Sequence, residues 1–251
     1  MMNQIFNIGK MADFFQIHAS ALRYWEEAGL ITPVKNNEND YREYSVDDLM
    51  TVSDILFYKN LGLPLKQIHE IEKTDVSGHQ KLLEEKMGEL KQQKKEIDRR
   101  IQKLQYHLNA ISALHDLEDH PFKITDIDTE CIVPFELIEI DKLKKYIDDP
   151  YLYSRVQHSS QPQQERRGLT VSLQEVNKIP KEQILWKKTE TKYVTCLMKE
   201  EIAAGYPNNL LSLLETVQEK YRTGYIISRF LLCAQENGKT YDFYKTYIEI
   251  L

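Results

Sequence analysis

Residues 22–30 read LRYWEEAGL, which is the pattern of a short amphipathic helix that ends on a glycine. Gly29 can adopt the left-handed conformation that closes a helix C-terminus. The triplet Arg23, Tyr24 and Trp25 is expected on the exposed side of this helix. An arginine beside two aromatic rings on such a face indicates a DNA-reading surface rather than a catalytic one.

The residues before this stretch predict another short helix. Asn7 is a suitable N-cap for a helix that runs to about Phe15. Its apolar positions recur at three- and four-residue spacing, at Ile8, Met11, Ala12 and Phe15. Together with a helix over residues 19–28, this predicts a helix-turn-helix.

The residues after it predict a short β-wing and a second pair of helices. Residues 31–34 and 41–44 are β-prone, and the polar residues 35–40 between them supply a turn. Ser45 followed by Asp48 resembles a capping box, so a third helix should begin there and end near Gly62. A fourth helix is expected from Leu65.

These residues together resemble the MerR family of transcription regulators over roughly the first seventy-five positions. The resemblance rests on Ile8-Gly9, Leu22-Arg23-Tyr24-Trp25, Gly29-Leu30, Tyr41-Arg42, Tyr44-Ser45, Asp48-Leu49 and Leu61-Gly62. It implies that Arg23, Tyr24 and Arg42 contact the DNA backbone. Lys59 resembles a lysine that the multidrug-responsive, BmrR-like branch uses near the operator centre.

The candidate DNA-binding residues lie on the second helix, the wing and the third helix: His18, Ser20, Arg23, Tyr24, Trp25, Lys35, Tyr41, Arg42 and Lys59. Many family members have a serine N-cap and an arginine on the reading helix, where this chain has His18 and Ser20. The operator sequence therefore does not carry over. Residues 1–75 hold seven Lys or Arg and twelve Asp or Glu, a net charge of −5, so we expect DNA binding with a modest salt dependence.

A long helix is predicted over residues 76–118. Its core, residues 78–117, has no proline and would measure ~60 Å. Alternating spacings of three and four define a heptad seam: Leu83, Met87, Leu90, Lys94, Ile97, Ile101, Leu104, Leu108 and Ile111. Because the chain has no second helix of this length, we expect the same helix of another subunit as its coiled-coil partner. Lys94 interrupts the seam, where it either sets the register or extends its amine to water.

Residues 121–251 have a different texture, with β-prone runs around two helical stretches at 141–149 and 209–221. They predict an α+β domain of two similar halves, about 122–176 and 183–251. Residues 142–147 and 193–196 are similar to the gyrase-inhibitor-like effector-binding domain of BmrR-like regulators. The predicted fold class is thus a winged helix-turn-helix domain (1–75), a dimerisation helix (76–118) and an α+β effector-binding domain (121–251).

This second resemblance implies a site between the halves for a lipophilic, often cationic, small molecule. Aromatic faces and a buried carboxylate would stabilise a desolvated cation. The candidate residues are Tyr146, Tyr151, Tyr153, Trp186, Tyr193, Tyr225, Tyr247 and Glu249. Register leaves two alternatives for the position of the family's pocket glutamate: Glu249, or Tyr247 two residues earlier. With Tyr247 there, a neutral or anionic ligand is as plausible as a cation.

The chain as a whole fits a cytoplasmic protein that has neither a membrane span nor a signal peptide. Cys131, Cys196 and Cys233 are far apart in the sequence, which disfavours metal sensing. Three buried, hydrophobic cysteines are the expectation, although a redox switch would need only two of them within disulfide reach. No cofactor is expected.

The function hypothesis is a homodimeric regulator, not an enzyme, whose effector-bound form distorts promoter DNA so that RNA polymerase can engage it. One alternative makes the C-terminal domain a hydrolase, with a water-accessible Glu249 as general base beside Tyr247. Turnover of candidate ligands would decide for it. Another alternative is a ligand-independent architectural repressor, which would be supported if no hydrophobic dye or drug changed the melting temperature.

Overall fold

The computed structural model describes residues 5–37, 39–71 and 73–251, and it divides the chain into two units that meet within one long helix. The first unit runs to Asp98 and the second begins at Arg99. Glu38, in the predicted turn of the wing, lies outside the described residues. Among the residues described, no helix has the length and apolarity needed to cross a membrane.

The N-terminal unit begins with helices α1 (Ile8–Phe15) and α2 (Ala19–Glu27), followed by strands β1 (Val34–Lys35) and β2 (Arg42–Glu43), and helices α3 (Val46–Asn60) and α4 (Leu65–Ile71). The predicted helix caps and the predicted glycine conformation are present in the structure. The Asn7 side chain accepts a hydrogen bond from the Lys10 backbone N–H, and Ser45 and Asp48 make a reciprocal capping box. Gly29 has φ +72°, as its place at the end of α2 requires.

One apolar core joins these helices. Met11, Leu22, Trp25, Val52 and Ile55 are fully buried in it. Strands β1 and β2 pair antiparallel over two residues each, at the place where the sequence predicts a wing. The helix-turn-helix thus presents the opposite side of α2 to solvent.

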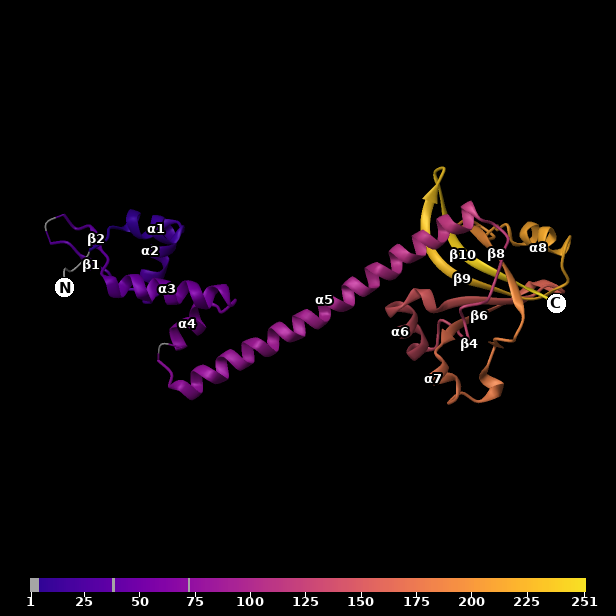
Figure 1. The fold of residues 1–251 in the computed structure, drawn as a ribbon, viewed down its shortest axis with the longest axis horizontal. Helices are drawn as coiled ribbons and strands as arrows, with labels where there is room; N and C mark the ends of the chain where they lie inside the picture. Colours follow the sequence, from indigo (N-terminus) through magenta and orange to yellow (C-terminus); the bar gives the residue numbers. More distant parts are fainter. Residues whose placement is uncertain (1–4, 38, 72) are drawn as a thin grey trace. The chain divides into compact units, whose positions relative to one another are not determined.

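Helix α5 (Val76–Asp119) is continuous over 44 residues, or about 66 Å (Figure 1). The ends of its seam are covered within their own units, because Leu83 packs on the N-terminal core and Ile111 on a cluster of the C-terminal domain. The middle of the seam is exposed at Met87, Leu90, Ile97, Ile101, Leu104 and Leu108. Exposed apolar rows of this kind are typical of interaction surfaces.

The C-terminal unit is built on one eight-stranded antiparallel sheet. Its strands are β3 (Lys123–Thr125), β4 (Cys131–Pro134), β5 (Tyr153–His158), β6 (Gln161–Val171), β7 (Trp186–Lys187), β8 (Lys192–Glu201), β9 (Thr223–Glu236) and β10 (Lys239–Ile250). The order across the sheet is β3-β8-β10-β9-β5-β6-β4-β7. The remaining elements are helices α6 (Ile140–Asp148), α7 (Leu173–Val176) and α8 (Leu210–Gln218), with 3-10 turns at Pro150–Leu152 and Lys181–Gln183.

The topology repeats within this sheet. In one half β4 leads through α6 to the hairpin β5–β6, and β4 pairs with β6; in the other β8 leads through α8 to β9–β10, and β8 pairs with β10. The halves meet where β5 pairs with β9. The short strands are exchanged, since β3 pairs with β8 and β7 with β4.

The two faces of the sheet are covered differently. Helices α6 and α8 pack on clusters that share Tyr153, so they cover the same face. The last turns of α5 pack on the other face through Ala110, Leu114 and Leu117. A groove remains on the first face, beside α6 and the loop that precedes α8, and residues of both halves line it.

Candidate functional site

Helix α2 separates its buried and exposed residues by side. Leu22 and Trp25 point into the core, whereas Arg23 and Tyr24 are exposed. His18 and Ser20 are exposed at the start of the helix, and His18 occupies the N-cap without a side-chain capping bond. The exposed surface of α2 therefore offers one cation, one aromatic ring and two small polar groups.

Arg23 lies beside the hairpin in a hollow of about 780 Å³ that Lys10, Tyr41 and Arg42 also line. Residues from three separate elements thus meet at one concave face. Arg42 is tied to α2, because its Nε donates to Glu26 Oε2 at 2.5 Å. This hydrogen bond, and the charge of Glu26, raise the pKa of the Arg42 guanidinium.

The other candidate cations differ in their partners. Lys35 faces Asp40 at 3.8 Å, with both side chains mostly exposed, so that pair contributes little to stability. Lys59 lies with its amine 5.3 Å from the centre of the Trp25 ring. Within the described residues Arg23 forms no ion pair, which leaves its charge available to an external anion.

One sequence expectation about this face is wrong. Trp25 is 1% exposed and belongs to the core, so it does not share the exposed side of α2 with Arg23 and Tyr24. The physical reason is helical geometry: Trp25 follows Leu22 by three residues and therefore lies on the same buried stripe. The ring of Trp25 instead contacts the amine of the exposed Lys59.

In the C-terminal domain, a groove of about 600 Å³ is lined by residues of α6, the loop before α8 and the strands of both halves. Three of its rings, those of Phe135, Tyr146 and Tyr153, form a cluster with centroids 5.7–6.5 Å apart. Phe230 and Tyr244 form an edge-to-face pair at 5.8 Å on adjacent strands. The groove therefore has aromatic walls from both halves of the domain.

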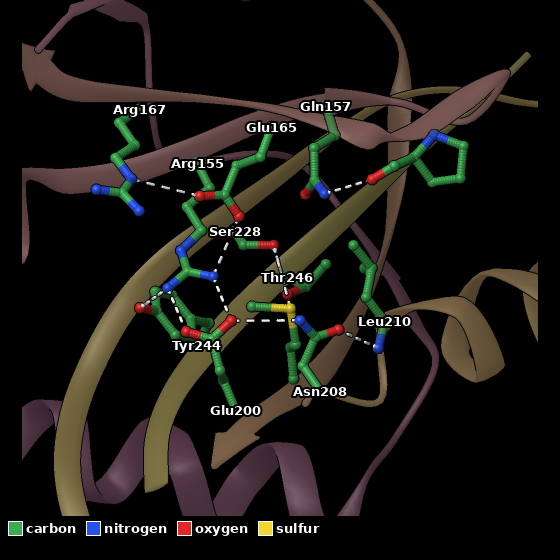
Figure 2. A network of polar contacts seen from close by, with 12 residues as sticks. Arg155, Gln157, Glu165, Arg167, Glu200, Asn208, Leu210, Ser228, Tyr244 and Thr246 are labelled. Carbon is green, nitrogen blue, oxygen red and sulfur yellow. Dashed lines mark hydrogen bonds and ion pairs between the residues drawn. The ribbon is translucent and has the colours of Figure 1, made fainter. Parts of the chain in front are cut away.

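A buried arginine lies at the centre of this groove (Figure 2). Arg155 is 7% exposed, and its two Nη atoms donate to the two carboxylate oxygens of Glu200, each at 2.6 Å. They also donate to Glu165 Oε2 at 3.1 Å and to the Tyr244 hydroxyl at 2.6 Å. The guanidinium carbon is 4.4 Å from the centre of the Tyr244 ring.

Carboxylates outnumber cations along the groove. Four acids line it, namely Glu136, Glu165, Glu200 and Asp242, against two arginines, Arg155 and Arg167. Burial and the nearby Glu200 raise the pKa of the Asp242 carboxyl, although contacts with Cys233 and Arg155 oppose the shift. Burial likewise raises the pKa of the Tyr244 hydroxyl. Such a groove favours a ligand that brings positive charge.

The structure divides the predicted effector residues among several places. Tyr146 and Tyr153 line the groove. Tyr151 and Tyr247 instead line a hollow of about 450 Å³ on the opposite face of the sheet, beneath the end of α5. Trp186 and Tyr193 belong to a core cluster with Tyr247, and Tyr225 packs edge-on against His158 at 5.2 Å. The expected grouping of these rings around one site is wrong for the last five.

Glu249 is a buried carboxylate whose hydrogen bonds join neighbouring segments of the domain. It is 5% exposed and accepts hydrogen bonds from the Tyr225 backbone N–H at 2.8 Å and from the hydroxyls of Thr191 at 2.8 Å and Thr189 at 3.1 Å. Side chains alternate along β10, so Tyr247 and Glu249 point away from the groove while Asp242 and Tyr244 line it. Neither residue of the two register alternatives therefore lines this groove. The water-accessible general base that the hydrolase alternative requires is not provided by Glu249.

The cysteines follow the sequence expectation in part. Cys131 and Cys196 are buried, but Cys233 is exposed on β9 near the tip of its hairpin with β10. Burial raises the pKa of the Cys196 thiol to about 12. Among the described residues, no three His, Cys, Asp or Glu side chains gather as metal ligands would.

The sequence profile of the family described as "MerR family regulatory protein" matches residues 7–44, from the N-cap of α1 to the end of the hairpin. We refer to α1–α4 and the hairpin, which contain this match, as the MerR domain. The match agrees with the family that the sequence resembles, and it covers most of the concave face formed by α1, α2 and the hairpin.

Curated relatives match only part of this chain. The HTH-type transcriptional regulator AdhR of Bacillus subtilis (strain 168) is 36% identical over 64 residues, which are 26% of this chain and 46% of that protein. The multidrug-efflux transporter 2 regulator of the same organism is 32% identical over 99 residues, 39% of this chain and 34% of that protein. The chain thus matches less than half the length of either relative.

A solved EcmrR-DNA complex matches 98% of this chain and 100% of its own, at 16% identity and a TM-score of 0.37. These values are too low for any role to be transferred from that complex. The functional groups outside the MerR domain must therefore be argued from their own geometry.

Sequence reasoning did not find Arg155, Glu200, Asp242 and Tyr244. Arg155 and Glu200 are 45 residues apart, and nothing local marks them as partners. A usable signal existed for the last strand, since the alternating residues Asp242 and Tyr244 place a carboxylate and a ring on one face.

Proposed function

We propose that this chain is a homodimeric transcription regulator that binds promoter DNA through its MerR domain and senses a small molecule with its C-terminal domain. The observation that carries the proposal is the meeting of Arg23, Tyr41 and Arg42 around one hollow, with Tyr24 exposed beside it. Guanidinium, phenol and backbone donors of this kind contact phosphate oxygens. The AdhR relative is itself a regulator.

Dimerisation through α5 is the second part of the proposal. The middle of its seam exposes six large apolar side chains along one stripe. Burying each of them would contribute roughly 1.5–3 kcal/mol, and another copy of the same helix matches the stripe in length. Such a dimer presents two MerR domains, so a pseudo-palindromic operator follows.

The C-terminal domain is proposed to be a gyrase-inhibitor-like effector domain of the BmrR-like type. Its repeated halves enclose a groove with aromatic walls and an excess of carboxylates. A lipophilic cation would lose its hydration there but gain ring and carboxylate contacts.

Effector binding would then shift the protein toward the conformation that distorts promoter DNA and lets RNA polymerase engage it. Smooth bending of a site of this size costs of order 1–6 kcal/mol. The effector can supply only its difference in affinity between the two conformations. Arg23, Tyr24, Arg42 and Lys59 are the residues proposed to hold the DNA.

A mobility-shift titration of the purified protein on DNA from its own upstream intergenic region tests the proposal. We expect saturable, sequence-specific binding that Arg23→Ala abolishes. Arg222→Ala is the matched control, because it removes the same charge from an exposed position in the C-terminal domain. If Arg222→Ala weakened binding as much as Arg23→Ala, or if the intact dimer bound no promoter DNA specifically, the proposal would fail.

A further inference from the structure

The groove proposed for the effector already contains a cation. Arg155 is almost fully buried there, where Glu200 holds it with two hydrogen bonds of 2.6 Å and Glu165 with a third of 3.1 Å. Its guanidinium also contacts the Tyr244 ring, 4.4 Å from the centroid. Two carboxylates and an aromatic face therefore surround one guanidinium, and we refer to Tyr244, Glu200 and Glu165 as the cage.

The cage has the chemistry of a cation-binding site rather than that of an ordinary packing ion pair. Arg155 faces two carboxylates and an aromatic ring within a hollow of about 600 Å³, and one of these carboxylates, Glu165, is shared with the exposed Arg167, whose Nε lies 3.6 Å from Glu165 Oε1. Asn208 supports the arrangement by donating to Glu200 Oε2 at 3.2 Å, which fixes the carboxylate from the other side. The same groups would hold a ligand cation equally well if Arg155 were elsewhere.

The bonding of Arg155 is incomplete at one atom. Its Nε has no hydrogen-bond partner among the described residues although it is buried, and an unsatisfied buried donor is unfavourable. A ligand cation that satisfied all of its donors in the cage would have an advantage over Arg155, which leaves one unpaired.

We propose that the cage is the cation subsite of the effector groove, that Arg155 occupies it as a built-in competitor in the ligand-free protein, and that effectors bind by displacing Arg155. This inference rests on the proposed effector role of the groove. The displaced cation has acidic neighbours along the same groove, Glu136 and Asp242.

The geometry also selects the class of ligand. Glu200 accepts two parallel N–H bonds in one plane, which is the bidentate match for a guanidinium or an amidinium. A quaternary ammonium ion has no N–H donors and could replace only the ring contact. Effectors carrying a planar aromatic amidinium or guanidinium should therefore bind better than quaternary cations of the same size and charge.

Calorimetric titration of the full chain with benzamidinium and with phenyltrimethylammonium tests this proposal. These two probes share a phenyl ring and a single positive charge, but only benzamidinium donates N–H bonds. We expect Arg155→Met to bind benzamidinium at least tenfold more tightly than wild type, with a smaller gain for phenyltrimethylammonium. The double variant Arg155→Met/Glu200→Gln should lose the gain, because it removes the bidentate acceptor.

Benzamidinium affinity that stays equal to or falls below the wild-type value in a folded Arg155→Met protein would overturn the proposal. If that variant does not fold, the wild-type chain answers by NMR of the Arg155 guanidinium N–H resonances. Added benzamidinium should shift them or speed their exchange with water. Unchanged resonances at saturation, or no binding at any soluble concentration, would also overturn it.

The outcome is separable from that of the proposed function, because no DNA is present. Benzamidinium that displaces Arg155 yet leaves promoter binding unchanged would support the cation subsite and remove its regulatory role. Promoter binding that responds to a ligand while Arg155 stays in the cage would support the regulatory function and overturn the displacement of Arg155.

Discussion

Replacing Glu249 with alanine should destabilise the C-terminal domain and leave ligand binding in the groove intact. Three donors converge on this carboxylate, the Tyr225 backbone N–H and the hydroxyls of Thr189 and Thr191. Hydrogen bonds to a charged group contribute about 1.5–3 kcal/mol each. The two hydroxyls can rotate toward other acceptors, whereas the Tyr225 N–H cannot, so we expect a total loss of about 3 kcal/mol.

Thermal unfolding followed by far-UV circular dichroism measures this loss. In domains of this size, 1 kcal/mol lowers Tm by about 2–4 °C, so Glu249→Ala should lower it by about 6–12 °C. Gly224→Ala should act in the same direction, because a Cβ at Gly224 would collide with Glu249 Oε2. Glu190→Ala, an exposed glutamate on the neighbouring loop, is the matched control and should leave Tm unchanged. A Glu249→Ala protein with normal Tm and no benzamidinium binding would refute the structural role.

Three further predictions concern the dimer, the groove and the DNA. Leu104→Glu should convert the dimer to monomer in size-exclusion chromatography with light scattering, because it puts charge on the seam, whereas the off-seam Gln92→Glu should not. The raised folded pKa of Asp242 means that this group holds its proton more tightly when folded, so its ionisation destabilises the domain as pH rises from 3.8 through the folded pKa. The Tm gain of Asp242→Asn over wild type should therefore grow across that window, and a gain independent of pH would contradict it. If Arg23 and Lys59 of each protomer are the cations that neutralise phosphates, the four contacts of the dimer give a slope of log K against log salt of about −4; a slope near −10 would mean that the MerR domain makes many more phosphate contacts.

Local signals accounted for most of what the sequence predicted correctly. The N-cap at Asn7, the capping box of Ser45 and Asp48, and the left-handed Gly29 each depend on residues within four positions of one another, and all three form. The long helix was predicted over residues 76–118 and is observed over Val76–Asp119. The spacing of apolar residues along a single helix can be recognised in the sequence without knowledge of the fold.

Non-local features were not predictable in the same way. The pair of Arg155 and Glu200 joins strands from the two halves, and the exposure of Trp25 depends on which stripe of α2 meets the other helices. For Tyr247 and Glu249 the difficulty was parity, because a strand has two faces and the sequence does not state which one carries the groove. The observed residues Asp242 and Tyr244 lie on the other face of β10, five positions before Tyr247 and Glu249.

Each half of the C-terminal domain contributes a short edge strand, β3 or β7, to the part of the sheet that the other half forms. Strand β3 lies in the first half of the sequence but completes the edge beside β8, and β7, which opens the second half, completes the edge beside β4. During synthesis, β3 must therefore wait for β8 to be made before it acquires any hydrogen-bonded neighbour. Neither half has its full set of strands alone, so the groove that we propose for the effector forms only when both halves have folded together.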